Sequence, residues 1–482
     1  MILKRLFLAF FILLFMLPQI NFAQSRGITG DWYGTLDVQG FMQLRIVFHI
    51  VEKNGQLTST LDSPDQSANG LPVAETKFES PELTLSMPML QAGYKGIVNG
   101  DFTELTGTFS QGGMDMPLTM GREAIGKAEV NRPQEPKPPF PYYEEEVTFE
   151  NAGASLTLAG TLTLPQKEGQ FPVVVLVSGS GPHNRNEELS GHKPFLVLAD
   201  YLVRQGIGVL RFDDRGVGQS TGDFGAATSE DFVTDALAAV GYLKTRPEVN
   251  TGQIGITGHS EGGLIAPLAA AQSNDVAFIV LLAGPGVVGK DLLLKQIRLI
   301  ALANGGNEDA VEKQATYSSE IFNIVCLISD TTELRTILTE VMERQFSELP
   351  EEDKKAIGDA DEYIKNQLAK IMTPWFRFFL CYDPAPALEQ VTCPVLALNG
   401  EKDLQVDPAQ NLGGIEAALK KAGNSNFKMK KLEGLNHLFQ TCEAGTPSEY
   451  GKIEETFSPV ALKEVSDWIL SILKYRAIPI KN

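Results

Sequence analysis

One short stretch of the chain has residue types and a spacing that suit nucleophilic catalysis. Residues Gly258-His259-Ser260-Glu261-Gly262 match the pattern Gly-x-Ser-x-Gly, between a β-branched run and a small, apolar run. In this pattern the serine sits on a sharp strand-to-helix turn with its hydroxyl exposed. Glycines on both sides let the strand and helix backbones approach closely. Because the pattern also arises by chance, the rest of the chain must supply a base, an acid and oxyanion donors.

A serine hydroxyl needs a neighbouring base, which is usually a histidine. The chain has five histidines, and His437 is the one that follows Ser260. In strand–turn–helix hydrolases the order along the chain is serine, acid, histidine. His259 adjoins the serine, and we expect its side chain to point away from Ser260. Elimination therefore favours His437 as the base.

The acid of such a site should follow the strand that precedes the histidine. Asp403 comes after the apolar run 394–398 and a glycine turn at Gly400. A carboxylate there can orient His437 and fix its tautomer. Asp407 is the alternative, and Glu401 is less well placed.

Backbone amides normally stabilise the oxyanion of such a serine enzyme. One donor is the amide of the residue after the nucleophile, here Glu261, and another comes from the loop after an early strand. That loop should be Ser178-Gly179-Ser180-Gly181-Pro182. We favour the Ser180 amide, with the Gly181 amide as the alternative. A plain glycine-rich turn is the other interpretation.

Strand and helix patterns alternate after residue 144, which indicates βαβ units and a mostly parallel, doubly wound sheet. The expected strands are 147–149, 156–164, 172–177, 208–212, 253–257, 277–282, 394–398 and 427–432. The expected helices are 194–204, 229–244, one from Ser260, 408–421 and 458–473.

The alternation is interrupted between about residues 289 and 388, where the pattern is helical. An insert of this kind suggests a helical cap over the carboxyl edge of the sheet. It contains the aromatic run Trp375-Phe376-Arg377-Phe378-Phe379. These rings could line a substrate pocket or form the core of the cap.

The N-terminal part has a different pattern. Residues 24–125 alternate between apolar and polar side chains, with frequent turn signals, which predicts an all-β sandwich or small barrel. Gly30-Asp31-Trp32-Tyr33-Gly34 faintly resembles the start of lipocalin-like barrels. We favour an accessory role over ligand binding. Five prolines crowd residues 133–141, so 126–143 is predicted to be a linker.

Residues 1–23 have the layout of a secretory signal peptide: a basic start, an apolar run and small residues at the end. An uncleaved anchor is the alternative. Cleavage would change the net charge from -19 to -21, with 39 basic against 60 acidic residues. We expect an exported protein, periplasmic or secreted, with no stable membrane insertion. Its acidic surface argues against nucleic acid as a partner.

Cysteines and glycine motifs say little about cofactors. The four cysteines, Cys326, Cys381, Cys393 and Cys442, allow three pairings, and free thiols are an equal alternative. The run Arg215-Gly216-Val217-Gly218 is not a dinucleotide loop, because Thr221 stands where the third glycine belongs. We expect this run to shape a loop beside the active site. We expect neither a metal nor a cofactor.

Several motifs, in order, give residues 144–482 a resemblance to the α/β-hydrolase superfamily. They are Gly179-Ser180-Gly181-Pro182, 211–220 (RFDDRGVGQS), 258–262 (GHSEG), 400–403 (GEKD) and Asn436-His437. They most resemble the exported esterase and serine aminopeptidase (S33)-like branch, near dienelactone-hydrolase-like proteins. Ser178 departs from the histidine that many relatives carry there. The resemblance implies an α/β-hydrolase fold and hydrolysis of carboxylic esters through an acyl-enzyme.

The sequence therefore predicts an exported serine hydrolase with a Ser260-His437-Asp403 triad. Its expected substrates are small-molecule esters with small or medium acyl groups. A peptidase or amidase acting on short peptides, or an acyl thioesterase, would use the same triad. A non-catalytic ligand-binding protein is a further alternative, against which the complete set of residues argues.

Overall fold

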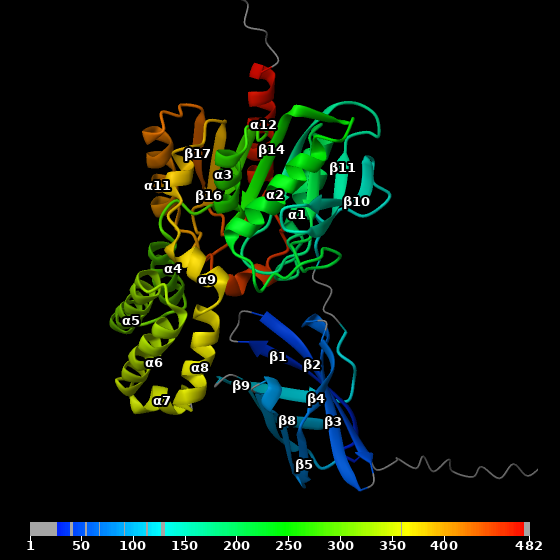
Figure 1. Ribbon diagram of the computed structural model, residues 1–482. Coiled ribbons are helices and arrows are strands. Elements are labelled where there is room, and N and C mark those ends of the chain that lie inside the picture. Colours follow the sequence, from blue (N-terminus) through cyan, green and yellow to red (C-terminus); the bar gives the residue numbers. More distant parts are fainter. Residues whose placement is uncertain are drawn as a thin grey trace, which may run out of the picture. The chain divides into compact units, whose positions relative to one another are not determined.

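The computed structural model describes residues 27–38, 42–53, 55–66, 68–90, 92–111, 114–126, 131–357 and 359–476. The chain folds as two units (Figure 1). Most of residues 27–126 form a β unit, and residues from 127 onward form an α/β unit. The predicted signal peptide, residues 1–23, lies outside the described residues.

The β unit is a single antiparallel sheet of nine strands that is nearly closed into a barrel. The strand order is β4-β3-β2-β1-β9-β8-β7-β6-β5. Strands β5 and β3 lie near opposite ends of this order, and a hydrogen bond joins them: the Thr76 hydroxyl of β5 donates to the Ser59 hydroxyl of β3 at 2.9 Å. The strands are β1 (Gly30–Val38), β2 (Met42–Lys53), β3 (Gln56–Ser63), β4 (Ala68–Val73), β5 (Glu75–Glu79), β6 (Glu82–Met87), β7 (Ala92–Val98), β8 (Glu104–Gln111) and β9 (Met114–Gly121), with 3-10 turns η1 (Pro64–Gln66) and η2 (Pro88–Leu90). Of the two predicted architectures, the structure is therefore the barrel.

Large side chains occupy the interior of this barrel-like sheet. Trp32, Phe48 and Tyr94 are buried. The Tyr94 hydroxyl donates to the Leu118 carbonyl at 3.1 Å, so its polar end is satisfied. The Arg122 guanidinium lies 3.5 Å from the centre of the Trp32 ring, a cation–π contact.

The α/β unit contains a mixed sheet of eight strands in the order β10-β11-β13-β12-β14-β15-β16-β17. The first two strands are antiparallel to their neighbours, and the remaining pairs are parallel. The strands are β10 (Tyr143–Asn151), β11 (Leu156–Leu164), β12 (Phe171–Val177), β13 (Gly208–Phe212), β14 (Val249–His259), β15 (Phe278–Leu282), β16 (Val395–Gly400) and β17 (Phe427–Leu432). The predicted mostly parallel sheet is thus confirmed.

Helices cover both faces of this sheet (Figure 1). One apolar core packs α1 (Pro194–Arg204) and α12 (Pro459–Arg476) on one face. The other core packs α2 (Ser229–Leu243), α3 (Gly262–Gln272) and α11 (Pro408–Lys421) on the opposite face. The prediction that α3 starts at Ser260 is wrong, because Ser260 has a φ of 51°, which a right-handed helix cannot contain.

A helical cap is inserted between β15 and β16 and runs from Gly289 to Leu388. Its helices are α4 (Gly289–Ala303), α5 (Glu308–Leu327), α6 (Thr331–Ser347), α7 (Glu351–Ile357), α8 (Ala360–Ile371), α9 (Pro374–Cys381) and α10 (Ala385–Leu388). Figure 1 shows α4 to α9 gathered beside one edge of the sheet. The cap has its own core, which includes Leu334, Leu338 and Leu368, so it packs as a partly independent layer.

One disulfide crosses the cap. Cys326, near the end of α5, is bonded to Cys381, the last residue of α9, over a sequence separation of 55. Cys393 and Cys442 take no part in a disulfide. The bond therefore fixes the aromatic helix α9 to the body of the cap.

The described part of the linker is bound to the α/β unit. Residues 131–142 form neither helix nor strand. The Arg132 guanidinium donates to the carbonyls of Gly191 at 3.0 Å and Gly451 at 2.9 Å. The Gln134 amide donates to the Phe457 carbonyl at 2.7 Å.

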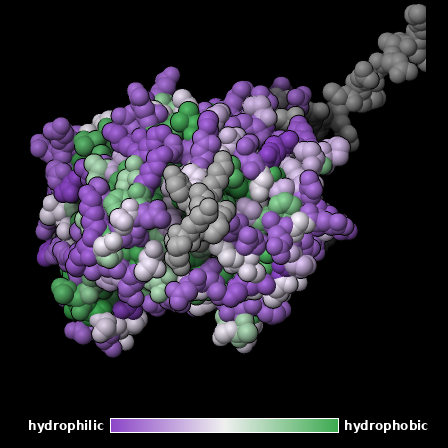
Figure 2. Space-filling view, turned by 90° about the horizontal axis from the view of Figure 1, so that it is seen from above, coloured by the Kyte–Doolittle hydropathy of each residue, from purple (hydrophilic) through white to green (hydrophobic). Residues whose placement is uncertain are grey.

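The surface is polar on the face shown in Figure 2, where hydrophobic side chains are scattered in small groups. Within the described ranges, no helix combines the length and apolar character that crossing a membrane requires. A short 3-10 segment, η3 (Pro447–Lys452), precedes the last helix.

The cap disulfide leads to a first prediction. A cross-link over 55 residues stabilises by about 2–4 kcal/mol, so Cys326→Ser/Cys381→Ser should destabilise the cap by that amount. Limited proteolysis in urea should cleave the cap of this variant at lower urea concentrations than the wild type. Cys393→Ser, the same change at a cysteine outside the disulfide, is the matched control. Equal protease resistance of the two variants would contradict the prediction.

Candidate active site

Ser260 lies on a turn where three backbone segments crowd together. It follows β14, precedes α3 and has a φ of 51°, a conformation that is strained for a residue with a side chain. A Cβ on Gly258 would lie 1.9 Å from the Gly262 carbonyl oxygen, and one on Gly262 would lie 2.1 Å from the Val177 carbonyl oxygen. Only glycine fits at these two positions, as the motif indicates. The Ser260 side chain itself is partly exposed.

Asp403 and His437 form a buried pair at the ends of two adjacent strands. His437 Nδ1 lies 2.8 Å from Asp403 Oδ2, and both residues are nearly inaccessible. The other carboxylate oxygen accepts from the amides of Gln405 and Val406 at 2.8 and 2.9 Å. These bonds fix the carboxylate, which in turn sets the orientation of the imidazole.

The alternatives to Asp403 have other roles. Asp407 is the N-cap of α11 and accepts from the Gln410 amide at 2.8 Å. Glu401 accepts from the Gly434 amide at 3.2 Å, and that contact lowers the pKa of its exposed carboxyl. Neither side chain is bonded to His437.

The serine and the histidine are near each other but are not bonded. The rings of His259 and His437 have centroids 4.8 Å apart, which places His437 beside the residue that precedes the serine. No hydrogen bond joins the Ser260 hydroxyl to any described residue. Such contacts are often loose before substrate binds.

The loop after β12 passes beside the nucleophile. A Cβ on Gly179 would lie 3.1 Å from Ser260 Cβ. The Gly179 amide donates to Glu187 Oε1 at 2.7 Å and is therefore occupied. Among the described residues, none accepts a hydrogen bond from the backbone amides of Ser180, Gly181 or Glu261. These amides remain available to an oxyanion, and the geometry leaves the choice between Ser180 and Gly181 open.

The side chain of Glu261 joins the cap to the nucleophile turn. Its Oε1 accepts from the Ser229 hydroxyl at 2.6 Å and from Trp375 Nε1 of α9 at 2.8 Å. Burial raises the pKa of this carboxyl, against the effect of its hydrogen bonds. Oε2 has no hydrogen-bond partner among the described residues, although Ser180 lies near enough to lower the pKa.

The aromatic run of α9 packs in two directions, and the part of it in the cap core confirms one of the two predicted purposes. Trp375 and Phe379 stack with ring centroids 5.4 Å apart, and Trp375 packs against the α/β core. Phe376 instead faces the cap core, where its ring lies 6.1 Å from that of Phe322. One side of the helix thus faces the nucleophile turn and the other holds the cap together.

Two carboxyls that sequence reasoning did not single out support the loop after β12. One is Glu187, and the other is Asp214, which accepts from the Ser178 hydroxyl and the His183 amide, each at 2.9 Å. Burial raises the pKa of Asp214 to about 8, against these two hydrogen bonds. Asp214 belongs to the Arg211–Ser220 motif, which was a usable signal, whereas nothing in the sequence marks Glu187.

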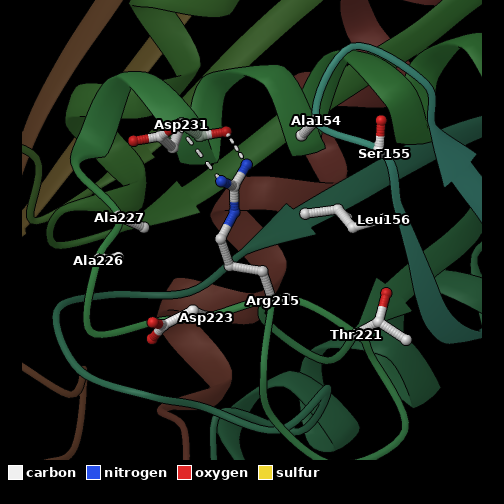
Figure 3. Close-up of a pocket in the computed structure, with 10 residues that line it drawn as sticks. Ala154, Ser155, Leu156, Arg215, Thr221, Asp223, Ala226, Ala227 and Asp231 are labelled. Atoms are coloured by element: carbon white, nitrogen blue, oxygen red, sulfur yellow. Dashed lines mark hydrogen bonds and ion pairs between the residues drawn. The ribbon is translucent and has the colours of Figure 1, made fainter.

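A surface pocket near this motif is separate from the serine site. Its lining residues include Leu156, Arg215 and Thr221, and none of Ser260, Asp403 or His437. Figure 3 shows Arg215 pointing toward Asp231 of α2. The guanidinium also binds Asp235 at 2.7 Å. Arg215 is thus held by acidic partners, which accords with the predicted loop-shaping role of its motif.

The described residues also bear on metal binding. Within them, no group of three or more His, Cys, Asp or Glu side chains is arranged to hold a metal ion.

The raised pKa of Asp214 leads to a second prediction. Its folded-state pKa of about 8 lies above the unfolded value of about 3.9, so between these pH values only the folded protein keeps the proton. Rising pH over this range therefore reduces the stability of the wild type. An asparagine amide cannot ionise, so the Asp214→Asn variant lacks this loss of stability. Its free energy of unfolding, relative to that of the wild type, should therefore rise between pH 5 and pH 8. The expected rise is at least about 1.4 kcal/mol, the equivalent of one pKa unit.

Urea unfolding of the α/β unit at several pH values measures this difference. The matched control is Asp223→Asn, at an exposed position of the same region, for which no such pH trend is expected. A stability difference for Asp214→Asn that does not change with pH would refute the assignment.

Comparisons with known proteins show the family to which the chain belongs. Residues 173–441 match the model of the serine aminopeptidase S33 family. Esterase EstD of Thermotoga maritima is 26% identical over 445 residues, which cover 91% of this chain and 96% of EstD. That match is longer than the α/β unit and so extends into the β unit.

Two further similarities are more limited. An uncharacterised protein of Pseudomonas aeruginosa, PA2218, is 33% identical over 136 residues, 28% of this chain and 35% of that protein. The solved Pyrococcus furiosus esterase Pf2001 aligns with a TM-score of 0.39 and 15% identity, over 69% of this chain and 93% of its own. The family match covers more than half of the chain: the protein is a serine hydrolase that belongs to the serine aminopeptidase S33 family of α/β-hydrolases.

Proposed function

We propose that the protein hydrolyses carboxylic esters through an acyl-enzyme on Ser260. The observation that carries the proposal is the strained nucleophile turn, with its φ of 51°, beside a histidine bonded to Asp403 at 2.8 Å. Ser260 is the nucleophile, His437 the base and Asp403 the acid that orients it. The amides of Glu261 and Ser180 hold the oxyanion.

The reaction follows from these positions. The Ser260 oxygen attacks the acyl carbonyl while His437 Nε2 takes its proton, and a tetrahedral intermediate forms with its oxyanion at the two amides. The intermediate collapses as the imidazolium returns the proton to the departing alcohol. Water then attacks the acyl-enzyme by the same route and releases the acid. The reaction requires the Ser260 hydroxyl to come within hydrogen-bond reach of His437, a contact of the kind that commonly tightens when substrate binds.

We propose a preference for small or medium acyl groups. The partly exposed Trp375, which hydrogen-bonds Glu261 beside Ser260 and stacks on the buried Phe379, offers an indole surface that an apolar acyl chain can contact. The full-length similarity to a protein named as an esterase also supports ester substrates. Export to the periplasm or the medium is part of the proposal and rests on the N-terminal sequence, as does the absence of membrane insertion after cleavage.

Removal of the nucleophile is the direct test. Ser260→Ala should lower kcat for p-nitrophenyl butyrate by about 10⁴–10⁶-fold, because no other group is placed to form the acyl-enzyme. The same substitution should abolish labelling by a fluorophosphonate. Ser180→Ala, which keeps the backbone amide, is the control and should retain most of the activity. Unchanged turnover by Ser260→Ala would refute the proposal.

A peptidase is the second candidate, because the matched family is described as serine aminopeptidase. A panel of p-nitrophenyl esters and aminoacyl-naphthylamides compares the two activities on one enzyme. We expect kcat/KM to be highest for acetyl to hexanoyl esters. Trp375→Ala should alter the preferred acyl length, since the indole lies over the nucleophile turn. A higher kcat/KM for the naphthylamides would instead favour the peptidase, and thioesters in the same panel test the remaining alternative.

A further inference from the structure

A second acid–histidine pair lies next to the nucleophile and takes no part in the proposed reaction. Glu187 Oε1 lies 2.9 Å from His259 Nδ1. The two residues are 2% and 6% exposed, so the pair is excluded from solvent. Buried ionisable groups are costly unless they are paired and hydrogen-bonded. The pair lies beside Ser260, and this position suggests a role that offsets the free-energy cost of burying two ionisable groups.

The partners of His259 indicate its charge. His259 Nε2 lies 3.0 Å from the His437 carbonyl oxygen, which can only accept a hydrogen bond. Nδ1 faces a carboxylate oxygen, which in its ionised form also only accepts. Both ring nitrogens therefore act as donors when His259 is an imidazolium and Glu187 a carboxylate.

The electrostatics of the pair agree with this assignment. Burial alone would raise the pKa of Glu187, but the charge and hydrogen bond of His259 outweigh it, and the pKa is lowered. Burial alone would lower the pKa of His259, but Glu187 and the His437 carbonyl outweigh it, and the pKa is raised. The other titratable groups that influence the pair are His183, Asp214 and Asp403, with the His437 ring 4.8 Å away.

The pair connects three parts of the site: the loop after β12, the nucleophile turn and the backbone of His437. Glu187 accepts from the Gly179 amide at 2.7 Å, which holds the loop after β12 against the nucleophile. His259 precedes Ser260 in the chain and holds the backbone of His437. Glu187 has a φ of 50°, a conformation that costs energy for a residue with a side chain. Its loop is thus bent to bring the carboxylate to this point.

We propose that Glu187 and His259 form a charged positioning pair that holds the oxyanion loop and the catalytic histidine at Ser260. The inference rests on the proposed function of Ser260 and His437. The pair touches no reacting atom, and it acts on the transition state through the Ser180 amide and the His437 ring. Its loss should therefore lower kcat and leave KM nearly unchanged.

The test compares Glu187→Gln with Glu188→Gln, the same change at the exposed neighbouring position. Turnover of p-nitrophenyl butyrate is expressed per active serine, titrated with a fluorophosphonate, so that unfolded protein is not counted. Glu187→Gln should lower kcat by about 10–100-fold, the usual size of an effect exerted through an orienting partner. KM should change by less than about threefold, since such a loss acts on the transition state alone. Glu188→Gln should behave as the wild type.

Two further measurements address folding and charge. Glu187→Asp restores the carboxylate and should recover part of the lost kcat, which a purely structural defect would not. In ¹⁵N-histidine-labelled protein, His259 should give two ring N–H signals in the wild type and one in Glu187→Gln, with His259→Gln used for assignment. This measurement decides whether the pair is charged even if Ser260→Ala were to retain activity and the proposed reaction had to be abandoned.

The outcomes that overturn the inference are specific. They are equal kcat values for Glu187→Gln and Glu188→Gln, a loss that lies in KM alone, or a single ring N–H on His259 in the wild type. If Glu187→Gln does not fold, the kcat of Glu187→Asp decides whether the proposal stands. A kcat for Glu187→Asp as low as that of His259→Gln, which has no charged pair, contradicts the proposal.

Discussion

The backbone around the nucleophile leaves no room for one additional carbon atom. Besides the contacts of Gly258 and Gly262, a Cβ on Gly263 would lie 2.5 Å from the Cα of Gly284, which follows β15. Strands β12, β14 and β15 can therefore meet helix α3 only through these glycines. The tight contact forces Ser260 into its left-handed conformation, and that conformation directs the hydroxyl out of the sheet. The positions of His437 and the oxyanion loop matter chemically because this one turn is rigid.

The side chain of Glu261 couples the cap to this turn. The carboxyl of Glu261, the residue after Ser260, accepts a hydrogen bond from Trp375 on α9. At the other end of α9, Cys381 is bonded to α5. A displacement of α9 would therefore act on the residue whose amide we propose as an oxyanion donor. This arrangement joins the aromatic helix of the cap to the turn that carries Ser260.

Much of this structure could be predicted from local sequence patterns. The candidate serine, acid and histidine each follow a recognisable strand, and the fold sets the order of these strands along the chain. Asp403 and His437 follow β16 and β17, and the helical insert separates β15 from β16. The beginning of α3 could not be predicted, since tertiary crowding overrides the helix preference at Ser260. Glu187 escaped notice because its partner His259 is 72 residues away and lies in a motif explained by the serine. The pairing of Cys326 with Cys381 depends on how two cap helices pack, which no local pattern encodes.

The three tryptophans are distributed in a way that suits optical study of this molecule. Trp32 is enclosed in the β unit beneath a guanidinium, Trp468 lies on the last helix in contact with Phe278, and Trp375 hydrogen-bonds a carboxyl beside the nucleophile. Each layer of the chain thus carries its own fluorophore in a different polar environment. With the other two indoles replaced, the emission of Trp375 becomes an intrinsic reporter of the contact between the cap and the nucleophile turn, without any attached dye.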